Sequence, residues 1–175
     1  MTTKSTNFKE KMTTELTNFI QSQARGLSPA DLNRLIVDLP ALRERFTKIP
    51  SQTYPYLSDQ LEFLSLVVKD QVAGLNRDLT AQTVAEATFA LLYFQNPTDL
   101  IPDSIPGMGL LDDAMIVSIV LRRHEQAFKR NSHAYKLHRP IPGFEVDELL
   151  SVISPLRVSS FFWSMTTRSR FSVPG

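Results

Sequence analysis

Residues 84–121 read VAEATFALLYFQNPTDLIPDSIPGMGLLDDAMIVSIVL and decide the fold of this chain. On both sides of the central prolines and aspartates, apolar residues recur every three or four positions, which is the period of an amphipathic helix. The first helix is expected to end at Asn96-Pro97, because the residue before a proline disfavours helical backbone. The second is expected to run from about Asp112 to about Arg130. Its apolar face is broad, which predicts burial on several sides.

The segment between these helices, residues 97–111, combines turn residues with large apolar ones. It holds three of the eleven prolines and two of the six glycines of the chain. Because it also carries several leucines and isoleucines, we expect it to be partly buried, and a buried loop must satisfy its backbone polar groups. Proline removes a donor, and aspartate accepts from the donors that remain. The sequence therefore predicts a Pro/Asp/Gly-rich buried connection between two core helices.

Helix start and stop signals extend the same pattern toward the N-terminus. Ser28 and Asp31, with Pro29 between them, form the signature of a capping box. Thr80 is placed as a second N-cap, and Gly74 stands where a helix would end. No stretch shows the sustained alternation of apolar and polar residues that a half-buried strand shows. We therefore expect an all-α protein.

Length and composition bound the domain organisation. The chain has 175 residues and no cysteine, so disulfides, thiolate zinc sites and a cysteine nucleophile are excluded. We expect a compact single domain of five to seven helices over residues 1–155. Residues 156–175 form an aromatic and basic tail that either docks on the core or, through Trp163, meets a membrane interface or a partner.

One long motif joins the end of the first helix of the deciding stretch to the start of the second. With its spacings it reads Tyr93-x3-Pro97-x-Asp99-Leu100-Ile101-Pro102-Asp103-x-Ile105-Pro106-x2-Gly109-x2-Asp112-Asp113. This motif resembles the signature of the YkvA-like domain-of-unknown-function family, and the resemblance lies within residues 84–124. It implies a small helical protein of a mostly bacterial family, some of whose members carry the signature beside or within membrane-associated helices. It implies no established reaction.

The four aspartates of the motif have two interpretations. Asp99 and Asp103 can each cap the turn that follows them. Asp112 can be the N-cap of the second helix, with Asp113 in its first turn. Alternatively, the four carboxylates converge on a divalent cation such as Mg²⁺ or Ca²⁺, which takes clustered oxygen ligands. Capping is preferred, because it explains the prolines, glycines and aspartates together. Tyr93 is expected to be a half-buried aromatic, with a hydrogen bond to one of the carboxylates as the alternative.

The net charge of +1 is a cancellation between two stretches. Six Asp or Glu residues and no Lys or Arg occur between Asp78 and Leu121, and a basic stretch follows. This change of sign suits the dipole of the second helix, and that interpretation is preferred. The alternative is a surface patch for anions or lipid headgroups. Its members would be Arg122, Arg123, Lys129 and Arg130.

The three histidines all lie in this basic stretch, at His124, His133 and His138. They show neither the His-x3-His spacing nor the cysteine partners of a zinc site, so a helix-dipole or surface position is expected for them. The near-zero net charge and the lack of interleaved aromatic residues count against nucleic acid as a partner.

No recognisable catalytic set of residues stands out, which favours a non-enzymatic interaction or scaffolding role with a protein partner. The alternatives are a divalent-metal site on the aspartates, hydrolytic if it is catalytic, and a peripheral membrane protein. The first twenty residues hold no apolar signal segment, and the longest uncharged run, Ala87–Thr98, is too short for the roughly 20 residues of a spanning helix. A cytoplasmic location is therefore expected, with the membrane surface as the alternative. The oligomeric state stays open.

Overall fold

The computed structural model describes residues 3–75, 78–96 and 110–132. Within these residues it contains six helices and no strand, which confirms the all-α class and the expected number of helices. The helices are α1 (Thr3–Arg25), α2 (Pro29–Phe46), α3 (Leu57–Val72), α4 (Ala81–Gln95), α5 (Leu111–Arg123) and α6 (Glu125–Ser132). The predicted buried connection over 97–109, the domain end at 155 and the tail over 156–175 lie outside the described residues.

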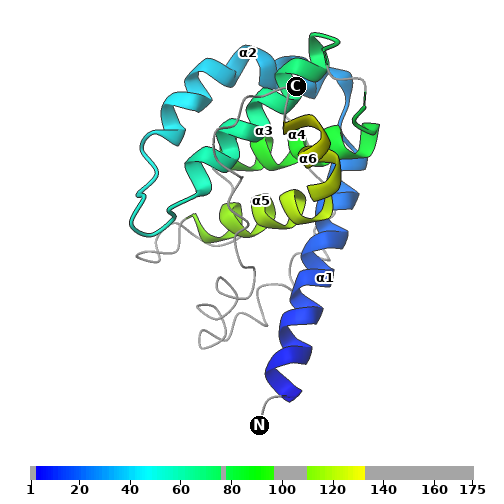
Figure 1. The fold of residues 1–175 in the computed structure, drawn as a ribbon, viewed down its shortest axis with the longest axis vertical. Helices are drawn as coiled ribbons and strands as arrows, with labels where there is room; N and C mark the ends of the chain where they lie inside the picture. The colour runs from blue at the N-terminus through cyan, green and yellow to red at the C-terminus, as the bar shows by residue number, and fades with distance from the viewer. Residues whose placement is uncertain (1–2, 76–77, 97–109, 133–175) are drawn as a thin grey trace.

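Helix α4 is the centre of the bundle (Figure 1). Helices α1, α2, α3 and α5 all contact it, so most of its side chains are buried on every side. Helix α5 is enclosed even more completely, because every residue from Leu111 to Leu121 is buried. This continuous burial confirms the prediction drawn from the broad apolar face of the second helix in the deciding stretch.

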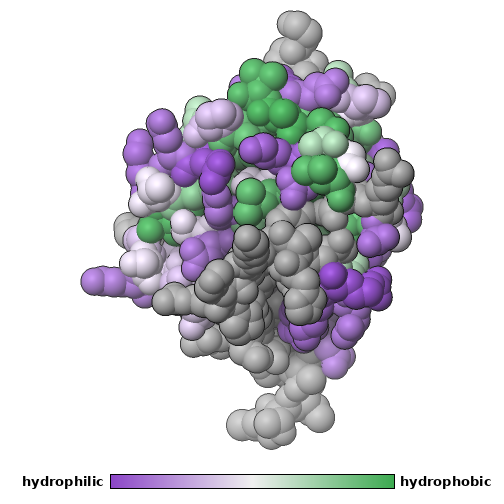
Figure 2. All heavy atoms as spheres, turned by 45° about the horizontal axis from the view of Figure 1, so that its top comes forward, coloured by the Kyte–Doolittle hydropathy of each residue, from purple (hydrophilic) through white to green (hydrophobic). Residues whose placement is uncertain are grey.

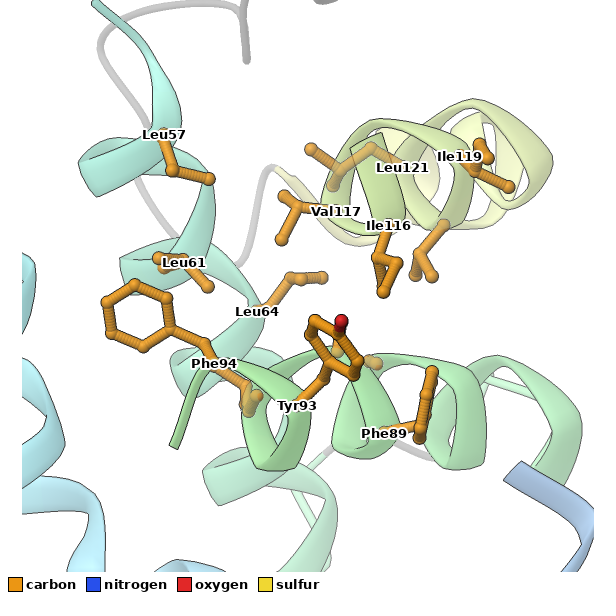
Figure 3. Close-up of a cluster of buried hydrophobic side chains, with 14 of the residues drawn as sticks. Leu57, Leu61, Leu64, Phe89, Tyr93, Phe94, Ile116, Val117, Ile119 and Leu121 are labelled. Atoms are coloured by element: carbon orange, nitrogen blue, oxygen red, sulfur yellow. The ribbon is translucent and has the colours of Figure 1, made fainter. Parts of the chain in front are cut away.

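The hydrophobic core lies where α3, α4 and α5 meet (Figure 3). The α3 leucines point toward aromatic side chains of α4 on one side and toward aliphatic side chains of α5 on the other. Aromatic edge contacts extend the core outward: Phe19 of α1 meets Phe89 of α4, and Phe63 of α3 meets Phe128 of α6 at 5.3 Å between ring centroids. All six described helices thereby contribute side chains to one core.

The predicted helix signals are confirmed. The Ser28 amide donates to Asp31 Oδ2 at 2.7 Å and the Asp31 amide donates to Ser28 Oγ, which completes the capping box. Thr80 Oγ1 accepts from the Thr83 amide at the start of α4. After α3, Gly74 takes a positive φ of 71°, which an L side chain rarely adopts, and this turn ends the helix.

Two boundaries differ from expectation. The helix predicted to run to about Arg130 breaks at His124, so that α5 ends at Arg123 and α6 begins at Glu125. The break occurs where the His124 backbone leaves the helical region, with φ −108° and ψ 16°, and where its side chain is bound to α4. The prediction of Asp112 as N-cap is also wrong: Leu110 is the N-cap residue, and Asp112 lies inside the first turn.

Helix α2 lies at the edge of the bundle and holds the C-terminal end of α4 (Figure 1). Arg45 donates to the backbone oxygens of Phe94 at 3.0 Å and Gln95 at 3.2 Å, and its guanidinium stacks 4.9 Å from the centre of the Phe94 ring. Asp38, two turns earlier on α2, accepts from the Gln95 side-chain amide at 2.7 Å. Because the last carbonyls of a helix lack intrahelical donors, Arg45 supplies partners that α4 cannot provide itself.

On the face shown in Figure 2, the described residues form hydrophobic patches among hydrophilic ones. Among the described residues, four large hydrophobic side chains are exposed: Val37, Tyr56, Val72 and Leu75. None of the helices in the described ranges combines the length and the apolar character that crossing a bilayer requires.

Candidate functional site

The start of α5 carries two buried carboxylates. Asp112 and Asp113 are both 3% exposed. The Tyr93 hydroxyl of α4 donates to Asp112 Oδ2 at 2.7 Å, and the other oxygen of Asp112 accepts from the Asp113 amide. Tyr93 itself is 3% exposed, so the preferred interpretation of a half-buried aromatic is wrong. The alternative, a hydrogen bond from Tyr93 to a motif carboxylate, is confirmed.

Tyr54, in the connection between α2 and α3, lies beside this acidic pair. Burial raises the pKa of the Tyr54 hydroxyl, and the charges of Asp112 and Asp113 raise it further, because a phenolate near carboxylates is disfavoured. A hydrogen bond with the Leu110 backbone acts in the opposite direction. Two tyrosines from different parts of the chain, Tyr54 and Tyr93, therefore lie beside the carboxylates at the α5 N-terminus.

The other two motif aspartates, Asp99 and Asp103, lie outside the described residues. Over the part of the chain that the structure describes, no three His, Asp or Glu side chains come together closely enough to hold a metal ion. The convergence of four aspartates on Mg²⁺ or Ca²⁺ therefore stays a prediction, and the described pair supplies two of its four carboxylates.

A second polar cluster links α4 to the α5–α6 junction, and it centres on Glu86. This carboxylate is 0% exposed. Its oxygens accept from Gln82 Nε2 at 2.9 Å and from Arg123 Nε at 3.1 Å, and His124 Nε2 lies 2.8 Å from Oε2. On the other side of the imidazole, Nδ1 lies 3.1 Å from the Thr83 hydroxyl. We call these five residues the Glu86 cluster.

Burial and hydrogen bonding compete at Glu86. Burial would raise the pKa of its carboxyl group, but the hydrogen bonds from Gln82, His124 and Arg123 outweigh that effect and lower the pKa below the ordinary value of 4.5. The group is therefore ionised at neutral pH. A buried, ionised carboxylate is tolerated because donors from two helices surround it.

The Glu86 cluster contains the order of groups that nucleophilic catalysis uses: a hydroxyl, an imidazole and a carboxylate. However, the hydroxyl belongs to Thr83, which is 2% exposed, so a substrate has no direct access to it. Arg123 also holds the carboxylate. The arrangement is thus suited to fixing α4 against α5 rather than to attacking a bound molecule.

The predicted anion patch is divided by the structure. Arg123 turns inward to Glu86, and Lys129 pairs with Glu125 one turn earlier on α6. The other two members of the patch, Arg122 and Arg130, are exposed. Unlike Arg123 and Lys129, they form no ion pair with a described residue.

His124 was expected at the helix dipole or at the surface; it is the C-cap residue of α5, which agrees with the dipole position, whereas the surface position is wrong. Its side chain is 12% exposed and bound between Glu86 and Thr83. The helix break and the contact of the imidazole with α4 occur at the same residue. His133 and His138 lie outside the described residues.

The sequence interpretation missed Glu86 as a site residue and counted it only as a charge. The signal was present, because Glu86 is the only charged residue in α4 and Gln82 stands one turn before it. A single carboxylate inside an apolar helix requires a partner when the helix is buried.

The fold and these contacts define a class of all-helical domain in which buried carboxylates join two central helices. Residues 83–119 match the model of a family described as a protein of unknown function (DUF1232), and the YkvA-like resemblance is consistent with that family. The match begins at Thr83 and ends near the end of α5, so it includes Glu86, Tyr93 and the buried aspartate pair. Neither the comparison with curated proteins nor that with solved structures gives a match to the chain.

Proposed function

We propose that the chain is a non-enzymatic helical interaction protein in which the family segment, residues 83–119, acts as a structural brace together with the residues that border it. The observation that carries the proposal is the environment of Glu86. Its buried carboxylate is bound by Gln82 of α4, by Arg123 of α5 and by His124 at the α5–α6 junction. A side chain with these contacts fixes one helix against another and leaves the outer surface for partners.

The second contact of the brace lies at the other end of the helix pair. Tyr93, near the C-terminus of α4, binds Asp112, in the first turn of α5. Because α4 and α5 are thus joined near both ends by charge-assisted hydrogen bonds, their register is fixed, and a shift would leave a buried carboxylate without its donors. This supports a structural role for the polar residues of the family segment.

Thermal unfolding of Asp112→Asn and Tyr93→Phe tests this proposal. Residues that form ligand sites usually cost stability, so replacing them often leaves a protein equally or more stable. Residues of a brace stabilise the fold, and we expect each variant to lose about 1–3 kcal/mol. Asp59→Asn is a matched control, because Asp59 occupies the first turn of α3 but is exposed; its expected loss is below about 1 kcal/mol.

The outcome that contradicts the brace is equal or higher stability in both Asp112→Asn and Tyr93→Phe. Circular dichroism at 25 °C should show that each variant keeps the helical content of the wild type. A stability gain with retained fold would instead indicate that the two residues are kept for a ligand.

A divalent-cation site is the second candidate, and the burial of two adjacent carboxylates, Asp112 and Asp113, favours it. In this proposal Mg²⁺ or Ca²⁺ binds between this pair and the aspartates of the preceding segment, Asp99 and Asp103. Unfolding temperatures in millimolar Mg²⁺, Ca²⁺ or Mn²⁺ provide the test, because a ligand that binds only the folded state raises them. A rise that disappears in Asp103→Asn supports the site, and no rise with any of the three ions refutes it.

A further inference from the structure

The outer face of α2 is an exposed helix surface on which small and apolar residues lie among polar and charged ones. The buried residues of this helix, Leu35, Leu39, Leu42 and Phe46, follow one stripe toward the core. Val37 lies on the opposite side and is 77% exposed, the largest value among the exposed large hydrophobic residues described. Figure 1 shows α2 at the edge of the bundle, with α3 and α4 on its inner side.

Small and apolar residues lie beside Val37 along this face. The positive charge of Arg34 lies toward the N-terminal end of α2, and the negative charge of Glu44 lies toward its C-terminal end. All of them are exposed. Arg34 and Glu44 form no ion pair with any described residue. We call the following set the α2 outer face: Ala30, Asn33, Arg34, Val37, Pro40, Ala41 and Glu44.

The order of charges on this face is self-complementary. When two copies of α2 run antiparallel and cross at the level of Leu39, residues equally far from Leu39 face each other. Arg34 of each copy then lies opposite Glu44 of the other, and Val37 lies opposite Ala41. Twofold symmetry repeats both contacts, so that one arrangement gives two ion pairs at the rim and an apolar centre between them.

We propose that the α2 outer face is a self-association surface on which a second copy of this chain docks with its α2 antiparallel. The alanines permit the two helices to approach closely, and Val37 loses its exposure to water. A parallel arrangement is disfavoured, because it places Arg34 against Arg34 and Glu44 against Glu44.

The charge pattern distinguishes this face from the other exposed hydrophobic residues. Val72 and Leu75 lie at the end of α3 and in the turn after it, so they occupy one short region rather than a stripe along a helix. Leu75 is 74% exposed, nearly as much as Val37, which makes it a suitable control position.

Sedimentation velocity of the full chain over a range of concentrations tests the proposal. We expect a concentration-dependent dimer in the wild type that Val37→Glu weakens by about tenfold or more, because two carboxylates would then be buried at the centre. Leu75→Glu introduces the same charge at a residue of nearly equal exposure outside the α2 outer face, and it should leave the dimer unchanged. Because both positions face solvent, neither substitution should alter the helical content.

Charge reversal gives a sharper second measurement. Arg34→Glu and Glu44→Arg should each weaken the dimer, because each places like charges opposite one another. The double variant Arg34→Glu/Glu44→Arg restores opposite charges and should return the dimer to about wild-type affinity. A monomer at every concentration, equal loss in Val37→Glu and Leu75→Glu, or a double variant that is weaker than both single variants would each overturn the proposal.

This inference names a partner for the interaction role proposed above and rests on it, but the two fail separately. A monomeric wild type would refute the pairing of α2 and would leave the stability of Asp112→Asn and Tyr93→Phe unaffected. Conversely, a dimer is compatible with a family segment whose aspartates serve a cation.

Discussion

Replacing Glu86 by glutamine removes one charge from the interior and changes the shape of the side chain very little. Glutamine still offers one oxygen to the surrounding donors, but it cannot balance Arg123 or accept hydrogen bonds at both of its terminal atoms. The Arg123 side chain is 29% exposed and its charge can partly return to water, so the loss should be smaller than that for a fully buried pair. We expect Glu86→Gln to cost about 2–3 kcal/mol.

For a chain of this length, that loss corresponds to a fall of about 4–12 °C in the unfolding temperature. The change can be followed by circular dichroism at neutral pH, with urea titration as a second measure of free energy. Glu62→Gln is the matched control. Glu62 also binds an arginine, Arg43, but the Arg43 side chain is 47% exposed and the Glu62 side chain is 34% exposed. Its expected cost is below about 1 kcal/mol.

The pH dependence gives the same prediction an independent check. The folded pKa of Glu86 lies below the ordinary 4.5. The contribution of its carboxylate to the free energy of unfolding is therefore complete above pH 4.5 and is lost as the pH falls through the folded pKa. The difference in stability between wild type and Glu86→Gln should therefore narrow on acidification below pH 4.5. A glutamine variant as stable as the wild type at neutral pH, or a difference that grows in acid, would refute the reasoning.

Three further predictions concern other contacts. Gly74→Ala should cost about 1 kcal/mol in urea unfolding, because alanine is strained at a φ of 71° although no atom blocks its Cβ; an unchanged midpoint would contradict this. Arg45→Ala should destabilise by about 2–3 kcal/mol, through lost hydrogen bonds to the end of α4 and lost stacking on Phe94, and Arg45→Lys should recover only part of it. Because the folded pKa of Tyr54 is raised above 10.0, stability should fall as the pH rises above 10, and Tyr54→Phe should remove this component of the alkaline loss.

Local signals in the sequence predicted much of the helical framework. The capping box at Ser28, the Thr80 cap and the positive φ of Gly74 depend on residues close in sequence, and all three are present in the structure. The burial of α5 was also predictable, because Ser118 is the only polar residue between Ala114 and Leu121. Short-range propensity and periodicity were sufficient for these elements.

The candidate site depended on contacts across the fold, which periodicity cannot supply. Nothing in the spacing of Glu86 and His124 shows that they meet, because their contact follows from the packing of α4 against the α5–α6 junction. The helix break lies at this contact, and neither a proline nor a glycine marks it in the sequence. A hydrogen bond from Tyr93 to one of the motif carboxylates was the less favoured alternative, and only the folded chain shows that its partner is Asp112 and that both residues are buried.

The attachment of α2 to α4 gives the bundle a mechanical linkage. Asp38 and Arg45 lie two turns apart on α2, and both form hydrogen bonds with the last turn of α4. A sliding motion of α2 along its axis would break both attachments at once or pull the end of α4 with it. A load applied to the outer surface of α2 would therefore be transmitted to the C-terminal turn of α4.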